Sequence, residues 1–558
     1  MLGTSLRELL FIRLCIVLLQ YGTPILAAGL VLAAATGGRA ALTHPASLAG
    51  LGYVLLDLLY AVFLWRPYAR RLRDEADHPP PLAPADRRAL FLRCNDNVPD
   101  FDRYLRLWFL GADPSEIRRD NVRDFVLWAF FDRRPGAESD DEAAECAGYL
   151  DIIEQRLGHD LKPGRGRAQS LRLTFDEIET RYRSFVWYIL ISIVDAATHV
   201  QLAWRGFEYH SLPVSKFAHV LPPRMQSFFA SKRSASPELS YWVRPHTAGP
   251  DKRPIVFLHG IGVGLWTYAD FLGSVGRSDA SDGDEGQVGI IALEIMPVSF
   301  RLTEAPLGKL DFLDEMARVL AAHPGWEQFV LITHSYGSAL ATHMLHSEEF
   351  SDRIDAAVLV DPVTILLHMP DVAYNFTRRR PRGANEWQLW YFASTDPGTA
   401  HALGRHFHWK QNIIWKEELV TKGKKKKEGT GRLSGTEMNG NGHGAAAAAV
   451  SRNPARSQRR NVAVCLAGRD LIVDTLSVAR YLAGNEDWLP WFGGDRSDDR
   501  VEEVDGVLDD VQRSAGYDHL EKDGIELLWF DGLDHAQVFD DRKHYDKLKA
   551  VIHRYCSK

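Results

Sequence analysis

A serine, an aspartate and a histidine stand in an order that could support acyl transfer: Ser335, Asp470 and His535. A serine hydroxyl attacks a carbonyl carbon efficiently only when a nearby base takes its proton. Histidine serves as that base when a carboxylate orients its ring, and N–H donors must hold the oxyanion that develops. These residue types therefore predict cleavage of an ester or a related acyl bond.

Ser335 lies between an apolar strand-like run, 329–333, and a helical run that begins at Gly337. A nucleophile on such a sharp strand-to-helix turn needs small neighbours because its backbone is strained. Gly337 meets that need two residues later, whereas Thr333 stands where the usual GxSxG pattern has its first glycine. Read alone, Ser335 could also be a helix-capping serine.

Asp470 is the predicted acid because it follows the apolar run 462–466, and parallel sheets present active-site groups at the carboxyl ends of their strands. Two other carboxylates compete with it. We expect Asp361 to fix a loop before a proline and Asp474 to cap the helix that follows it.

His535 is the predicted base because it follows the last apolar run, 525–530, and precedes the C-terminal helical stretch 542–555. A solvated loop histidine is the alternative. The order serine, acid, histidine is nevertheless the one expected for a nucleophile on this type of turn.

A glycine-rich loop, His-Gly-Ile-Gly-Val-Gly over 259–264, follows the apolar run 255–258. Its glycines allow backbone N–H groups to converge on an anion. We predict the N–H groups of Ile261 and Tyr336 as the oxyanion donors. The loop lacks the lysine of a phosphate loop and falls short of the dinucleotide pattern GxGxxG, and we expect no cofactor.

The elements that must position these residues are apolar runs alternating with helical ones, which is typical of an α/β fold with a mostly parallel sheet. The strand-like runs are 239–243, 255–258, 289–293, 329–332, 357–360, 462–466 and 525–530.

As a set, these pieces resemble the α/β-hydrolase superfamily over residues 240–558. The resemblance implies a flanked, mostly parallel sheet, a Ser/Asp/His triad and a lid inserted after the sixth strand, at 363–418. The chain looks most like membrane-anchored serine esterases and lipases of this superfamily. Epoxide hydrolases and dehalogenases share the fold but use an aspartate nucleophile, so they rank last.

The alternative from another class is a catalytically inactive membrane scaffold or lipid-binding protein with the same fold, suggested by Thr333 and by the long N-terminal region. The expected partners of the enzyme are an apolar acyl-ester substrate and a bilayer or lipid-droplet surface. The net charge of −7 gives no indication of nucleic-acid binding.

Residues 1–75 are predicted to form a membrane anchor of two apolar helices, 14–35 and 46–65, each long enough to cross a bilayer. The arginines that follow the second helix predict that the catalytic domain and both termini face the cytosol. The alternatives are a cleaved signal peptide and a hairpin in one leaflet, which Pro24 and Asp57 leave open.

The rest of the chain divides into a helical extension, 85–235, and a hydrolase domain, 238–558. In the extension we expect a helix over 175–204. Its apolar part, 185–194, is short for a span and favours a buried or interfacial helix, with a third span as the alternative. Residues 420–460 are of low complexity and predicted to be disordered.

Other patterns carry less weight. The five cysteines are scattered singly, which indicates reduced thiols rather than a disulfide framework. His401, His406 and His408 lack the spacing and fourth ligand of a zinc site, and we expect no metal. Asn375 lies in a glycosylation pattern that would be used only in a lumen.

Overall fold

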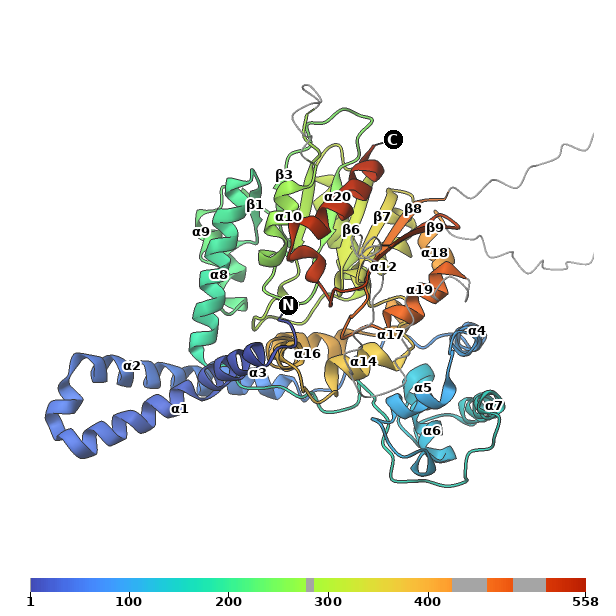
Figure 1. Cartoon of the computed structure of the whole chain (residues 1–558), viewed down its shortest axis with the longest axis horizontal. Helices are drawn as coiled ribbons and strands as arrows, with labels where there is room; N and C mark the ends of the chain where they lie inside the picture. Colours follow the sequence, from blue (N-terminus) through green and yellow to red (C-terminus); the bar gives the residue numbers. More distant parts are fainter. Residues whose placement is uncertain (1, 277–285, 424–458, 485–517, 558) are drawn as a thin grey trace, which may run out of the picture.

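The computed structural model describes residues 2–276, 286–423, 459–484 and 518–557, and one sheet forms its centre (Figure 1). Within these residues the sheet has ten strands in the order β2-β1-β3-β5-β4-β6-β7-β8-β10-β9. The strands are β1 (Glu208–Ser211), β2 (Lys232–Arg233), β3 (Ser240–Arg244), β4 (Ile255–Leu258), β5 (Ile290–Glu294), β6 (Phe329–His334), β7 (Ile354–Val360), β8 (Asn461–Ala467), β9 (Asp518–Lys522) and β10 (Ile525–Phe530).

The central strands β5, β4, β6, β7, β8 and β10 are parallel to one another, and β3 and β9 pair antiparallel with their neighbours. Ile255 and Phe257 of β4 belong to one apolar core, whereas Val256 and Leu258 belong to the other. Successive side chains of a strand point to opposite faces, so the sheet is covered on both sides. The predicted α/β fold class is confirmed.

The sheet begins earlier than the sequence predicted. β1 pairs with β3 through Tyr209 and Trp242, and β2 extends the sheet beyond β1. Both strands lie within 85–235, which we expected to be helical and separate from a domain starting at 238. They are only four and two residues long, too short for a clear alternating pattern.

The helices flank the sheet and build the N-terminal region (Figure 1). The α-helices are α1 (Leu6–Thr43), α2 (Pro45–Tyr60), α3 (Arg66–Arg71), α4 (Pro84–Asp96), α5 (Phe101–Trp108), α6 (Arg119–Val126), α7 (Asp140–Leu157), α8 (Phe185–Trp204), α9 (Gln226–Phe229), α10 (Ala269–Ser274), α11 (Lys309–Ala321), α12 (Gly337–Leu345), α13 (Glu348–Ser351), α14 (Pro370–Thr377), α15 (Ala384–Gln388), α16 (Pro397–His401), α17 (Trp409–Asn412), α18 (Lys416–Val420), α19 (Thr475–Ala483) and α20 (Arg542–Cys556).

The helices α1 and α2 form a hairpin that projects from the body of the molecule (Figure 1, blue). By length and composition, three helical segments are able to cross a membrane: Leu6–Thr43, Pro45–Arg71 and Phe185–Trp204. The first two contain the predicted apolar helices. The third contains the run 185–194, which is short for a span by itself. The helix is long enough because it continues past Asp195 to Trp204.

The base of the hairpin is fastened to the start of α8. Asp57 of α2 accepts a 2.6 Å hydrogen bond from the backbone N–H of Phe185, and Ser184 Oγ donates to the carbonyl of Leu19 in α1. Asp57 thus satisfies an N–H that the first turn of α8 would otherwise leave unpaired. This role explains a carboxylate inside an apolar run. The helix predicted over 175–204 begins only at Phe185.

The inserted segment 363–418 packs on α1. Ile12 and Ile16 form a buried cluster with Tyr391 of this segment, and the N–H of Leu2 donates to Gln388 at 2.8 Å. The connection that follows α3 is held as well, because Arg405 Nε donates to the carbonyl of Asp74 at 2.6 Å. Most of the low-complexity stretch 420–460, predicted to be disordered, lies outside the described residues.

Candidate active site

Ser335 occupies the turn between β6 and α12 and is buried. Its φ is 49°, in the left-handed region that non-glycine residues rarely adopt and that a nucleophile on such a turn requires. Gly337 makes the turn possible, since a Cβ at that position would come within 2.4 Å of the carbonyl oxygen of Leu258. A Cβ on Gly260 would lie 2.9 Å from the Cβ of Ser335.

Thr333, which replaces the first glycine of the motif, is accommodated inside β6. It pairs with Leu258 on one side and Leu359 on the other, and its side chain is fully buried. Its hydroxyl has no hydrogen-bond partner among the described residues. The turn at Ser335 therefore forms without that glycine, at the cost of one buried hydroxyl group without a partner.

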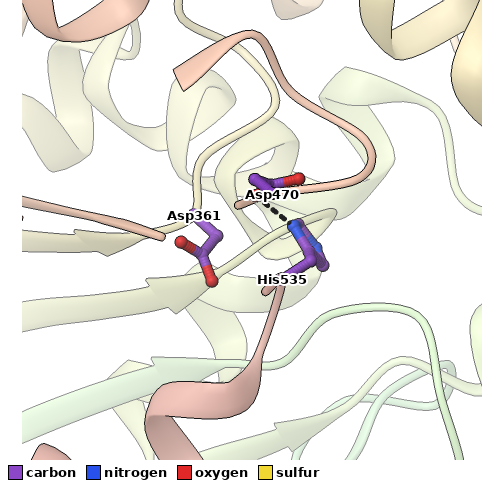
Figure 2. Close-up of side chains that lie close together, drawn as sticks. All are labelled: Asp361, Asp470 and His535. Carbon is purple, nitrogen blue, oxygen red and sulfur yellow. Dashed lines mark hydrogen bonds and ion pairs between the residues drawn. The ribbon is translucent and has the colours of Figure 1, made fainter. Parts of the chain in front are cut away.

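The structure brings Ser335, His535 and Asp470 together from three separate loops. His535 Nε2 lies 2.9 Å from Ser335 Oγ. On the other side of the ring, His535 Nδ1 lies 2.7 Å from Asp470 Oδ2, the contact drawn in Figure 2. His535 follows β10, and Asp470 follows β8, the parallel neighbour of β10. All three side chains are at least nine-tenths buried. A base in contact with both a hydroxyl and a carboxylate is the arrangement that activates a serine.

The two competing carboxylates have the supporting roles that the sequence predicted. Asp474 caps α19 by accepting from the N–H of Ser477. Asp361, at the end of β7, accepts 2.9 Å hydrogen bonds from the backbone N–H groups of Ala467 and Ala536. Asp361 therefore connects the loop that carries the acid to the loop that carries the base.

The acid has further hydrogen-bond partners, which hold its orientation. Asp470 Oδ1 accepts from the N–H groups of Ile472 and Val473 at 2.7 and 2.9 Å, which leaves Oδ2 for His535. Asp534 accepts from the N–H groups of both Leu471 and His535, at 2.9 and 2.7 Å. The carboxylate and the imidazole are therefore fixed by backbone contacts as well as by each other.

The charges around His535 raise the pKa of its imidazole. Burial by itself lowers the pKa of His535, but the negative charge of Asp470 and the hydrogen bond to it outweigh burial and raise the pKa to about 9. Burial raises the pKa of Asp361 to about 7, against the opposing influence of the His535 charge. The neighbouring His334 is kept neutral, since burial lowers its pKa well below the ordinary value.

The predicted oxyanion donors lie beside the nucleophile. Ile261, Tyr336 and Ser335 line the same pocket, and no hydrogen bond within the described residues uses the N–H of Ile261 or Tyr336. Tyr268 holds the preceding residue, because its hydroxyl accepts from the N–H of Gly260 at 3.2 Å and lies 2.7 Å from His334 Nδ1. Two unpaired N–H groups next to a serine suit a developing oxyanion.

A family model described as alpha/beta hydrolase fold matches residues 253–410, which include the glycine-rich loop and Ser335. This part of the chain therefore has the α/β-hydrolase fold. Solved structures that are similar to this chain include two carboxylesterases and a phospholipase. No curated protein matches this chain by sequence.

Carboxylesterase CesB from Bacillus subtilis is 10% identical, with 66% of this chain and 98% of that chain covered and a TM-score of 0.32. A bacterial membrane phospholipase A is 10% identical, with 66% and 94% covered and a TM-score of 0.32. Naproxen esterase from Bacillus subtilis is 13% identical, with 58% and 89% covered and a TM-score of 0.30.

An apolar pocket opens in front of Ser335 and contains about 890 Å³ of empty space, its open mouth included. The inserted segment 363–418 forms one wall with Leu367, Phe376 and Phe407. Trp108 and Trp128, both from the N-terminal extension, form part of another wall of the pocket. A largely apolar pocket ending at a nucleophile can hold an acyl chain.

The extension residues of the pocket were missed by sequence reasoning. Trp108 and Trp128 lie more than 200 residues before Ser335 in the chain, and contacts at that separation leave no local pattern. The one sequence signal was the abundance of tryptophan, which a large core explains equally well.

Metal binding has one candidate group among the described residues: Asp361, Asp470 and His535, whose ligand atoms lie within 4.8 Å of one another. Hydrogen bonds account for this proximity. His535 Nδ1 is bonded to Asp470, and both oxygens of Asp361 accept backbone N–H groups. Figure 2 shows the three side chains converging on one another with the His535–Asp470 contact already made.

Proposed function

We propose that this protein is a membrane-associated serine hydrolase that cleaves carboxylic esters, with lipid acyl esters as its substrates. The continuous contact from Asp470 through His535 to Ser335 is the observation that carries the proposal. The apolar pocket supports an acyl substrate, and the two projecting apolar helices support attachment to a membrane.

In the proposed mechanism, neutral His535 takes the proton of Ser335 as Ser335 Oγ attacks the ester carbonyl carbon. The negative charge of Asp470 stabilises the imidazolium that results and explains the raised pKa of His535. The N–H groups of Ile261 and Tyr336 donate to the oxyanion. His535 then protonates the departing alcohol. In the second half of the reaction, water attacks the acyl-enzyme while His535 takes its proton, and that proton returns to Ser335 Oγ as the carboxylic acid is released.

The proposed location follows from charge. Arg66, Arg70, Arg71 and Arg73 come directly after the second apolar helix and are exposed to solvent. Clusters of arginine and lysine next to a membrane helix remain on the cytosolic side. We therefore infer that the catalytic domain faces the cytosol, at the surface of a bilayer or a lipid droplet.

A fluorophosphonate probe, which reacts covalently with activated serines, tests the proposal directly. The wild-type protein should be labelled and should hydrolyse p-nitrophenyl esters, and Ser335→Ala should lose both properties. Ser338→Ala is the matched control, because Ser338 lies one turn away and its hydroxyl donates to the carbonyl of Ser335. Labelling that persists in Ser335→Ala would remove this residue from its role. A folded wild-type protein that binds lipid but neither reacts with the probe nor cleaves any ester would favour the inactive scaffold.

A further inference from the structure

The outward face of α8 is apolar along its whole length. Its exposed large apolar residues are Ile189, Leu190, Ile193, Val200 and Trp204. Their spacing of mostly three, four and seven residues places them on one stripe of the helix. Trp204 is 87% exposed. Ala196 and Ala197, which lie between Ile193 and Val200, are exposed too. The stripe has no cover from the described part of the chain.

The opposite face of α8 is fixed to the catalytic body. Asp195 is buried and forms ion pairs with Arg301 and with Arg224, the second at 3.5 Å. Leu202 is fully buried in the core beside α10 and the sheet. If α8 left the body to cross a bilayer, Asp195 and Arg301 would lose their buried ion pair, and of its two ion pairs Arg224 would keep only the one with Glu294. Its length permits a span, but its contacts hold it against the protein.

The hairpin brings this stripe to the membrane. The start of α8 contacts the hairpin at Asp57, and from Pro45 at the hairpin tip to Asp57 the helix α2 rises only about 18 Å. A hydrocarbon core is about 30 Å thick. The hairpin therefore cannot insert to its full depth unless α8 comes to the membrane surface.

The direction of α8 and its surroundings fit such a surface. In Figure 1, α8 runs across the direction of the hairpin, on the side of the body from which the hairpin projects. Next to it, α9 adds the exposed side chain of Phe229, and the loop before α9 adds Met225. The exposed arginines of α3, which follows α2 along the chain, suit the phosphates of lipid headgroups.

We propose that the outward stripe of α8 is a second membrane contact, which lies along the boundary between headgroups and acyl chains while the α1–α2 hairpin inserts. Apolar side chains with a tryptophan at one end are what such an interfacial helix presents. The inference rests on the membrane association in the proposed function and is independent of its catalysis.

The test uses an environment-sensitive fluorophore, NBD, on a single accessible cysteine of the full-length protein, whose other four cysteines are buried. Cys15 is changed to serine, because it is the one cysteine that is not buried. Trp204→Cys then places the label on the stripe. Gln155→Cys, at an exposed position of α7 across the molecule from α8, is the control (Figure 1). Vesicles of phosphatidylcholine with phosphatidylserine are added, and binding is measured separately by flotation.

We expect the protein to float with the vesicles. The label at position 204 should then shift to the blue, gain intensity several-fold and be quenched by spin-labelled lipid, while the label at 155 should not change. Flotation without a change at 204 would overturn the inference and leave membrane association intact. Failure to float would overturn both. A blue shift without vesicles, with a doubled mass in light scattering, would assign the stripe to a second copy of the chain. Esterase activity is measured in parallel and tests the proposed catalysis separately, because none of these outcomes depends on it.

Discussion

Asp361 accepts a 2.9 Å hydrogen bond from the backbone N–H of Ala536, the residue that directly follows His535. Its other oxygen accepts from the N–H of Ala467, at the end of β8. One buried carboxylate thus sets the distance between the acid loop and the base loop. It does this without contact to Ser335, which makes it a positioning residue.

Asp361→Asn should therefore lower both stability and activity. An amide offers one oxygen, so one of the two N–H groups would face an NH₂ group and lose its partner, at a cost of about 1–3 kcal/mol. Urea unfolding should show this loss, and kcat should fall about tenfold or more if the two loops separate. An activity loss without any change in unfolding would contradict the positioning role.

Asp470→Asn should reduce kcat by roughly 10³–10⁴-fold, because an amide can neither stabilise the imidazolium nor hold the required tautomer of His535. Asp474→Asn is the matched control. Asp474 lies four residues away in the same loop and caps α19, a role that asparagine fills equally well. Activity on a short p-nitrophenyl ester decides the question, and equal losses in both variants would contradict the assignment of the acid.

The pH dependence should follow His535. The base form is the neutral imidazole, so kcat/KM should rise with pH from 6.5, the ordinary pKa of histidine, toward about 9, the raised pKa. The rate of fluorophosphonate labelling should follow the same curve. The stability of the fold should change with pH in the opposite direction. The charged pair of His535 and Asp470 stabilises the fold fully below pH 6.5, and this contribution is lost as pH rises through about 9. A labelling rate that is flat across this interval would contradict the assignment.

Gly337→Ala should disrupt the nucleophile turn. A Cβ there would come within 2.4 Å of the carbonyl oxygen of Leu258, and overpacking of this type costs about 1–3 kcal/mol. Gly262→Ala provides the control in the facing loop, because nothing lies within 4 Å of the added atom. Thermal unfolding and probe labelling should both be impaired in the first variant and preserved in the second.

The pocket predicts a preference that depends on acyl length. Ala373 is a small residue of α14 that lines the pocket, and Ala373→Trp would fill part of the space. We expect kcat/KM to fall about tenfold or more for long-chain p-nitrophenyl esters and to change less than about threefold for the acetate. This corresponds to about 1.4 kcal/mol of binding free energy for the longer chain. Equal losses for both substrates would mean that the acyl chain lies elsewhere.

Much of the candidate site could be predicted from local patterns. Each of the residues Ser335, Asp470 and His535 follows an apolar strand, and parallel strands end at one edge of a sheet, so their order along the chain sufficed to group them. The replacement of glycine by Thr333 could not be judged from sequence, because it depends on the space that β4 and β7 leave around one side chain.

What the sequence could not predict depends on contacts between distant segments. Asp57 looked like an interruption of a membrane helix, whereas it caps α8, which begins 128 residues later. Trp108 and Trp128 had no link to the active site until the fold placed the extension beside it. The short strands β1 and β2 depend on pairing with β3 rather than on their own residues.

The contacts at the hairpin base have a mechanical consequence. Ser184 and Phe185 bind both arms of the hairpin, Ile12 and Ile16 support Tyr391 of the segment above the active site, and Arg405 fixes the chain that leaves α3. The hairpin is therefore rigidly attached to the body of the molecule rather than joined to it by a flexible linker. If the hairpin inserts into a bilayer as proposed, the pocket mouth keeps a fixed orientation relative to the lipid. Removing the hairpin would also expose Tyr391 of the segment that forms one wall of the pocket.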